Sequence, residues 1–217
     1  MRKDLSIAFT GDVLLGRVVA EEAILTHKAP WEKILQQLNE WDFKVCNFEG
    51  AIGSSESCRQ KNPNLSNLCF YVSTGNLTSW GKMPFNAVSF TNNHCNDLGE
   101  KGRENTKDYL NAQSIEVFTW EGSPNIVYVG DRRIAFLSID EITGGDLKSQ
   151  EFDLLRQRIS LAKFVSDLVV VNVHWGNELQ SWANPVMIAE AKWMIDQGAD
   201  IIIGHHPHVV ISPSVYK

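Results

Sequence analysis

Five short apolar segments, each followed directly by polar residues, constrain the fold of this chain more than any other feature of its sequence. They are rich in β-branched and aliphatic residues and end at polar or glycine-containing turns, which is typical of buried strands. The five predicted strands are Leu5–Thr10, Phe43–Phe48, Ala87–Thr91, Leu168–Val173 and Asp200–Ile203. Two further segments, Ile126–Val129 and Arg133–Ile139, flank Gly130 and Asp131, and this spacing predicts an antiparallel hairpin.

Segments with helical spacing of apolar residues lie between these strands. The predicted helices are Val18–Lys28, Trp31–Glu40, Leu77–Lys82, Arg103–Ala112, Phe152–Val165 and Pro185–Gln197. Asn184 and Gly198 are typical residues for the two ends of the last of these helices. Strands that alternate with helices predict an α/β fold, here with an added hairpin. The long polar stretch Gly53–Ser73 is interpreted either as a functional flap or as a poorly ordered loop.

The size and charge of the chain limit the number of domains and the kinds of partner that we expect. Its 217 residues, 43% of them hydrophobic, are enough for one substantial core, so we expect a single domain over residues 1–217. The net charge is -6 and both signs are scattered, which excludes the basic surface that a nucleic-acid partner requires. We therefore expect no nucleic acid as a partner.

The N-terminus and the cysteines bear on location. The apolar run near the N-terminus has only about five residues and no later run approaches the roughly 18 of a membrane span, so we expect no membrane span. As given, the chain is expected to be cytoplasmic; it would be membrane-associated or extracytoplasmic if an N-terminal segment had been removed. The four cysteines form no CxxC pair and are interpreted as reduced. Cys58 and Cys69 are the one plausible disulfide if the protein is exported.

Residues that can bind a metal follow each of the five strands. In an α/β sheet the strand ends at one edge are where loops converge and ligands bind, so we expect these side chains to gather there. Carboxylates, an amide and imidazoles together are typical of a metal centre. The candidates are Asp12 after the first strand, Glu49 at the end of the second, Asn93 and His94 after the third, His174 after the fourth, and His206 and His208 after the fifth.

Each of these residues has a purely structural alternative. Asp12 could cap a turn, Glu49 could be a solvated strand end, and Asn93 could bond its own backbone. His174 alone would more often be a core histidine than a ligand. The strongest single signal is the sequence from Gly204 to His208, because glycine permits a sharp turn and two imidazoles two residues apart point the same way in an extended segment. The joint occurrence of the residues favours the metal site.

Five sequence blocks are similar to those of the CapA-like poly-γ-glutamate capsule biosynthesis proteins, a branch of the calcineurin-like metallophosphoesterase superfamily. The blocks are GDVLLGR at Gly11–Arg17, NFEGAI at Asn47–Ile52, SFTNNHCNDLGEKG at Ser89–Gly102, VNVHWGNE at Val171–Glu178 and GADIIIGHHPHVV at Gly198–Val210. The resemblance implies an α/β/β/α sandwich of two mixed sheets flanked by helices. Family members continue into a further strand beyond the last block, so we expect this chain to lack that C-terminal segment.

The resemblance also implies roles for the candidate residues. Asp12 and His208 would hold one metal ion, and Asn93, His174 and His206 a second, with Glu49 between them. His94 would meet the leaving group or the phosphoryl oxygens, and we predict it as a catalytic residue together with Asp12. In the superfamily the first motif is Asp-x-His and the bridging residue is Asp; here Leu14 replaces the histidine and Glu49 the aspartate. One or two divalent ions are therefore expected.

Oxygen and imidazole ligands suit Mn, Fe or Zn, which polarise phosphoryl oxygens and make water a stronger acid. Arg17 is predicted to bind a substrate phosphate or carboxylate, with a solvated arginine as the alternative. Glu178 is also included in the predicted substrate-binding site; it would orient a ligand histidine or be a plain surface glutamate.

Three functions follow from these patterns. The first is a metal-dependent hydrolase of phosphoesterase type, linked by resemblance to the synthesis or export of poly-γ-glutamate, with a small molecule or an anionic polymer as substrate. The second is hydrolysis or transfer at an amide bond of that polymer, because the same metal chemistry attacks a carbonyl. The third is a non-catalytic member of a polyglutamate synthesis complex.

Overall fold

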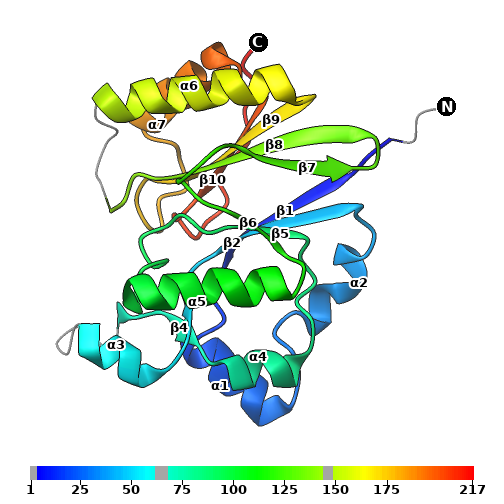
Figure 1. Ribbon diagram of the computed structural model, residues 1–217, viewed down its shortest axis with the longest axis vertical. Coiled ribbons are helices and arrows are strands. Elements are labelled where there is room, and N and C mark those ends of the chain that lie inside the picture. The colour runs from blue at the N-terminus through cyan, green and yellow to red at the C-terminus, as the bar shows by residue number, and fades with distance from the viewer. Residues whose placement is uncertain (1–3, 62–67, 144–148) are drawn as a thin grey trace. The chain divides into compact units, whose positions relative to one another are not determined.

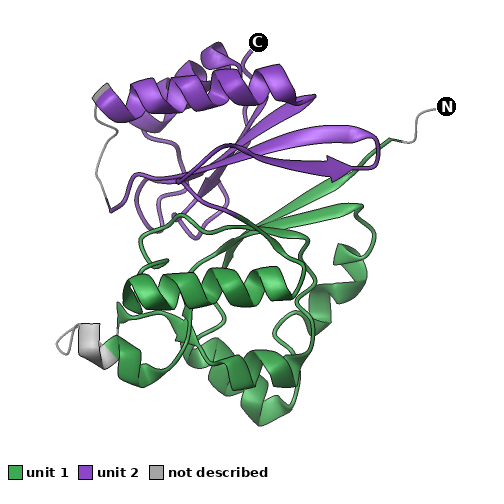
Figure 2. Ribbon diagram, in the orientation of Figure 1, with its two compact units in different colours: residues 1–117 green, residues 118–217 purple. Residues whose placement is uncertain are grey.

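The computed structural model describes residues 4–61, 68–143 and 149–217, without the side chains of 59–61 and 149. The contacts within the chain divide it into two compact units, residues 1–117 and residues 118–217 (Figure 2). Each unit contains one four-stranded sheet. The α/β class, with two sheets flanked by helices, is confirmed.

The sheet of unit 1 has the strand order β1-β2-β5-β6, formed by Ile7–Val13, Phe43–Phe48, Ala87–Ser89 and Glu116–Phe118 (Figure 1). β2 pairs in parallel with both β1 and β5. A small parallel sheet joins β3 (Ala51–Ile52) to β4 (Tyr71–Val72). The helices are α1 (Arg17–Thr26), a 3₁₀ turn at Glu32–Ile34, α2 (Leu35–Leu38), α3 (Ser55–Lys61), α4 (Thr74–Trp80) and α5 (Gly99–Ala112).

The core of unit 1 lies between its sheet and its helices. Phe48 of β2 and Phe90, which directly follows β5, pack edge to face with ring centroids 6.1 Å apart. Leu77 of α4 and Leu110 of α5 are buried in the same cluster. β2 and β5 are parallel and almost entirely buried, which is why they are nearly continuous apolar runs in the sequence.

The sheet of unit 2 has the strand order β10-β9-β8-β7, formed by Ile201–His205, Leu168–His174, Arg132–Asp140 and Asn125–Val129. β7 and β8 are antiparallel and turn at residues 130–131, so the predicted hairpin is confirmed. β9 pairs in parallel with β8 and β10. Helices α6 (Ser149–Val165) and α7 (Pro185–Gln197) pack on this sheet through Leu155, Ile159 and Met194.

Three predictions need correction. The helix expected at Trp31–Glu40 is a 3₁₀ turn followed by a single helical turn, because Ile34 N–H bonds to the Trp31 carbonyl three residues back. The stretch Gly53–Ser73 is not a plain loop, since it includes α3 and β4; its residues 62–67 lie outside the described residues. The reduced interpretation of the cysteines is wrong for Cys58 and Cys69, which form a disulfide.

Among the described residues, no helix combines the length and the apolar composition needed to cross a bilayer. The single domain expected over residues 1–217 stays a prediction beside the division into two units.

Candidate metal centre

Asp12 lies inside a strand rather than after it. β1 continues past its predicted end, and Asp12 pairs with Asn47 of β2 after a register irregularity between Phe9 and Asp12. Gly11 has a φ of 85° at this irregularity, a conformation that suits glycine. The bulge therefore sets the direction of the Asp12 side chain at the carboxyl end of the sheet.

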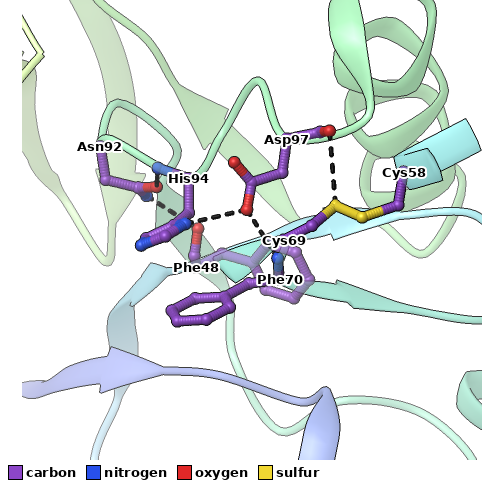
Figure 3. A network of polar contacts seen from close by, with 7 residues as sticks. All are labelled: Phe48, Cys58, Cys69, Phe70, Asn92, His94 and Asp97. Carbon is purple, nitrogen blue, oxygen red and sulfur yellow. Dashed lines mark hydrogen bonds and ion pairs between the residues drawn. A yellow bond between two sulfur atoms is a disulfide. The ribbon is translucent and has the colours of Figure 1, made fainter. Parts of the chain in front are cut away.

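A chain of buried amides links Asp12 to the turn after β5. Asn47 Nδ2 donates to Asp12 Oδ1 at 2.8 Å, and Asn92 Nδ2 donates to Asn47 Oδ1 at 3.0 Å. Asn92 Nδ2 also donates to the Phe48 carbonyl at 2.9 Å, and the His94 N–H donates to Asn92 Oδ1 at 3.1 Å (Figure 3). Each amide uses its donor and its acceptor, so the orientation of Asp12 and the path of the 92–94 turn depend on each other.

Glu49 and Asn93 lie at neighbouring strand ends of unit 1. Glu49 follows β2 and is 3% exposed, and its N–H donates to the Val13 carbonyl at 3.1 Å. Burial of a carboxylate is costly unless cations or hydrogen bonds offset it, which suits a position beside a metal ion. Asn93 is half-buried in the turn after β5.

Cys46 is buried, and this burial, together with the charge of Asp12, raises the pKa of its thiol well above the usual value.

Three imidazoles gather at the strand ends of unit 2. His174 ends β9, and its ring centroid lies 4.8 Å from that of His206. The centroids of His206 and His208 are 5.8 Å apart, and one ring nitrogen of each lies within 4.8 Å of the other. His174 and His206 are buried and His208 is exposed. Such spacing brings imidazole nitrogens within reach of one ion.

The segment after β10 is not extended, in contrast to the prediction. His206 and His208 both have positive φ, 92° and 55°, a conformation that residues with side chains rarely adopt. The two imidazoles lie together because the backbone bends at each of them. Gly204 is required, because a Cβ there would lie 2.8 Å from Trp175 Nε1. His205 is buried, with Nε2 3.4 Å from Asn172 Oδ1.

The predicted substrate-binding residues are exposed. Arg17 begins α1 with a φ of 54°, and its guanidinium carbon lies 5.3 Å from the centre of the Phe70 ring. Glu178 lies in the turn after β9. The roles of both residues stay predictions.

The model of the bacterial capsule synthesis protein family PGA_cap matches residues 6–217 of this chain. The chain belongs to the PGA_cap family. Two relatives have names that agree with this family. The "Capsule biosynthesis protein CapA" of Bacillus anthracis is 31% identical over 98% of the chain, and the "PGA biosynthesis protein CapA" of Bacillus subtilis strain 168 is 27% identical over 98%. The chain spans 56% and 60% of the length of these relatives. The predicted family resemblance is confirmed.

A solved structure shares the fold of this PGA_cap chain. The crystal structure of a hypothetical protein from Thermus thermophilus superimposes with a TM-score of 0.50 at 17% sequence identity. The match covers 94% of the chain and 69% of that protein. At this identity the likeness concerns the fold alone.

Four residues of the site region were not predicted from the sequence. Asn47 and Asn92 belong to the PGA_cap blocks, but their amide chain depends on the pairing of β1, β2 and β5. Asp97 and Phe70 contact His94. The three-residue spacing from His94 to Asp97 was a usable signal for Asp97, whereas no local pattern relates Phe70 to His94 across the intervening chain.

Proposed function

We propose that this chain is a metal-dependent hydrolase of phosphoesterase type that acts in the synthesis or export of poly-γ-glutamate, an anionic capsule polymer. The observation that supports it most is the cluster of three imidazoles, His174, His206 and His208, at the strand ends of unit 2. Two of these residues have strained backbone conformations, which are concentrated at functional sites in proteins. The polymer comes from the names of the two capsule relatives.

The side chains present suit a divalent ion. Unit 1 offers the carboxylates of Asp12 and Glu49 and the amide of Asn93, and unit 2 offers imidazoles. Nitrogen and oxygen donors of this kind suit Mn, Fe or Zn. The family motifs imply one or two such ions, and the ligands that the motifs imply remain Asp12, Glu49, Asn93, His174, His206 and His208. A bound ion would supply Lewis acidity toward a phosphoryl or carbonyl oxygen.

The remaining roles belong to side chains of unit 1. Asp12 is held in one orientation by Asn47, so its carboxylate needs little reorganisation on binding a ligand. His94 contacts the leaving-group oxygen or the phosphoryl oxygens of the substrate and serves in proton transfer. Arg17 binds an anionic group of the substrate, and its position over Phe70 limits the directions in which its guanidinium points.

Amide chemistry on the same polymer is the second candidate. The relative from Bacillus subtilis is named for PGA biosynthesis, and a γ-glutamyl polymer is joined by amide bonds. The metal and proton-transfer groups that act on a phosphoester also act on a carbonyl. The assay therefore includes a γ-glutamyl amide beside phosphomonoesters and phosphodiesters.

The disulfide favours the extracytoplasmic alternative for this chain. Disulfides form and persist in oxidising compartments, and Cys58 and Cys69 are bonded. A capsule polymer is displayed at the cell surface, so a site outside the cytoplasm agrees with the proposed role.

The metal assignment is tested by elemental analysis of protein purified without chelator. We expect wild type to contain Mn, Fe or Zn, and His174→Ala to lose most of it, because one imidazole of a small ligand set is removed. His27→Asn is the matched control: His27 is an exposed histidine that ends α1 with a φ of 54°, which asparagine also tolerates. Equal metal content in wild type and His174→Ala contradicts the assignment.

The catalytic assignment is tested with His94→Ala. We expect this variant to keep its metal and to lose on the order of 100-fold or more in turnover of an activated phosphoester. Metal-loaded wild type that hydrolyses no phosphomonoester, phosphodiester or γ-glutamyl amide would falsify the hydrolase and leave a non-catalytic role in a polyglutamate synthesis complex.

A further inference from the structure

β7 is an edge strand of the sheet of unit 2, with β8 as its neighbour on one side (Figure 1). Its residues, Asn125–Val129, include no charged side chain and no proline. Proteins usually protect an edge strand with such residues, because its unpaired backbone groups can pair with another chain. β10 at the other edge differs, since its isoleucines, Ile201, Ile202 and Ile203, are all half-buried.

The outward backbone groups of β7 belong to Ile126 and Tyr128. In a hairpin closed by a two-residue turn, the residues beside the turn exchange hydrogen bonds, and bonded and non-bonded pairs then alternate. Val129 and Arg132 flank the turn, so Val129 and Val127 bond to β8, whereas Ile126 and Tyr128 direct their N–H and C=O groups away from it. Within the described ranges, these two residues have no hydrogen bond on that side.

The side chains of Ile126 and Tyr128 lie on the face of the sheet that α6 covers. Residues that pair directly point to the same face, and Ile126 pairs with Ala135, which belongs to the core beneath α6. Ile126 is 37% exposed and Tyr128 is 70% exposed. Two large apolar side chains therefore lie uncovered beside the outward backbone groups.

α6 extends this apolar surface. Phe152 of α6 contacts Trp193 of α7, with ring centroids 4.9 Å apart, which identifies the side of α6 that faces α7. Leu154 lies about 200° further round the helix and Leu161 two turns beyond it, so both are on the opposite side. Since α7 contacts β10 while α6 contacts β8 and β9, this opposite side is the one toward β7. Leu154 and Leu161 are both exposed.

A second copy of the chain fits this edge. With a two-fold axis at Val127, Ile126 of one copy pairs with Tyr128 of the other, and each such pair exchanges two hydrogen bonds through the outward N–H and C=O groups. The same pairing places the isoleucine beside the tyrosine ring, a favourable combination across strands. The symmetry uses the β7 edge of both copies, so the association ends at a dimer.

The charges near β7 agree with this pairing. The strand itself carries none, so two copies of it do not repel each other. The two-fold axis places the segment before β7, with the exposed Glu121, near the hairpin turn of the other copy, which is followed by Arg132. Arg132 Nε lies 3.7 Å from Asp131, too far for a hydrogen bond, so its guanidinium donors remain for a carboxylate of the second copy.

We propose that β7 is a dimerisation edge, at which two copies of this chain pair antiparallel about Val127, with Leu154 and Leu161 of α6 beside the paired strands. The dimer does not rest on the proposed hydrolase and is tested without any assay of activity.

Sedimentation equilibrium measures the association. We expect wild type to form a dimer with a dissociation constant on the order of 1–100 μM, because a short edge strand is a small interface. Tyr128→Glu should raise this constant about 10-fold or more, since the pairing would bury a carboxylate of each copy beside Ile126. In the monomer the new charge is balanced by Arg133, which pairs with position 128.

Val18→Glu is the matched control for Tyr128→Glu. Val18 lies on α1 in unit 1 and is 71% exposed, so the same acidic side chain is introduced at an equally open position. We expect this variant to dimerise like wild type. Circular dichroism of both variants establishes that they are folded.

Cross-linking tests the register. On the two-fold axis the two Val127 residues form a non-hydrogen-bonded pair with Cα atoms about 4.5 Å apart, within the range of a disulfide. Val127→Cys should therefore be cross-linked between copies by dioxygen with copper–phenanthroline as catalyst. Two thiols each give up one proton and one electron, and dioxygen is reduced to hydrogen peroxide.

Asn125→Cys is the control for the register. Residue 125 lies on the same face as residue 127, but its two copies would be about 14 Å apart along the paired strands, too far for a disulfide. Wild type under the same conditions gives the background from its own cysteines. The cross-linked dimer is a gain of product, so misfolding of a variant does not account for it.

Three outcomes overturn the dimer as proposed. A wild type that stays monomeric up to about 1 mM leaves the surface to a partner other than this chain. A dimer that tolerates Tyr128→Glu as well as Val18→Glu forms through another surface. Equal cross-linking of Val127→Cys and Asn125→Cys contradicts the two-fold axis at Val127.

Discussion

At the scale of single residues, two buried asparagines relate the candidate ligands of unit 1 to one another. Asn47 and Asn92 are almost fully buried, and each bonds through both atoms of its amide. Removal of one buried, hydrogen-bonded amide is costly, because its former partners stay buried and no water reaches them to take its place. We therefore expect that the loss of any one of these hydrogen bonds disturbs the others between Asp12 and His94.

The first prediction concerns Asn47→Leu, which keeps the volume and removes the amide. Asp12 loses a donor and Asn92 loses an acceptor, so we expect the free energy of unfolding to fall by about 1–3 kcal/mol in urea denaturation. Asn111→Ala, on the exposed surface of α5, should change it by less than about 0.5 kcal/mol. Equal effects of the two substitutions would contradict the importance of the amide chain.

Whether a feature of the site could be predicted depends on how far apart the residues that form it lie in the sequence. Asp12 and Glu49 were predicted because strand ends are visible as the ends of apolar runs; in unit 1, Asp12 lies within the last two residues of β1 and Glu49 directly follows β2. The amide chain and the stack of Phe70 on His94 were not predicted, because they join side chains from different strands and turns. The bent conformation at His206 is a tertiary effect that no spacing of residues specifies.

At the scale of elements, the sequence was most informative where particular residues are typical of the ends of a helix. α7 begins and ends as predicted, since Asn184 Oδ1 accepts from Met187 N–H at 2.9 Å and Gly198 ends the helix with a φ of 117°. The two-residue strands β3 and β4 were not predicted, because two residues are too few to show a periodicity.

The second prediction concerns this N-terminal cap of α7. Asn184→Ala removes the acceptor for an N–H of the first turn, so we expect a loss of about 1 kcal/mol in the free energy of unfolding. Asn184→Asp keeps an acceptor oxygen at the same position and should restore most of it. Urea denaturation of the three proteins decides, and an alanine variant as stable as wild type would show that the cap is unimportant.

The third prediction concerns the pH dependence of the contact between β8 and the turn before β9. Asp167 accepts from Arg133 N–H at 2.8 Å and from Arg133 Nη2 at 3.1 Å, and these bonds lower the pKa of Asp167. A carboxyl whose pKa is lower in the folded state contributes stability above its unfolded pKa of about 3.9, and this contribution is lost as the pH falls through the folded value.

Asp167→Asn should therefore have a lower melting temperature than wild type at pH 7, and the two proteins should converge as the pH falls from about 4 to 2. The effect is small, because both side chains are open to solvent, Arg133 at 45% and Asp167 at 34% exposure. Thermal unfolding at a series of pH values measures it. A gap that stays constant over this range would assign the difference to something other than the charge of Asp167.

At the scale of the whole molecule, each unit has a hydrophobic core of its own. One core includes Leu110 of α5 and the other Leu155 of α6, and both side chains are fully buried. The single domain expected over residues 1–217 stays a prediction, since length and composition show only the amount of apolar residues and not how contacts divide them.

The fourth prediction follows from these two cores. Leu110→Ala and Leu155→Ala each leave a cavity, so we expect each to lower the free energy of unfolding by about 2–5 kcal/mol. Leu161→Ala, on the exposed side of α6 at 48% exposure, should have an effect below about 1 kcal/mol. Denaturation followed by fluorescence and by circular dichroism measures the loss, and a core variant as stable as the surface variant would contradict the assignment of that core.

The place of β10 at the edge of its sheet has a consequence for local stability. β9 is bonded on both sides and β10 on one, so the backbone amides of β10 are expected to exchange with solvent faster than those of β9. His206 and His208 directly follow this less protected strand. Whatever binds their imidazoles must therefore also suppress local opening of β10, so part of the binding free energy would be measurable as slower amide exchange along Ile201–His205.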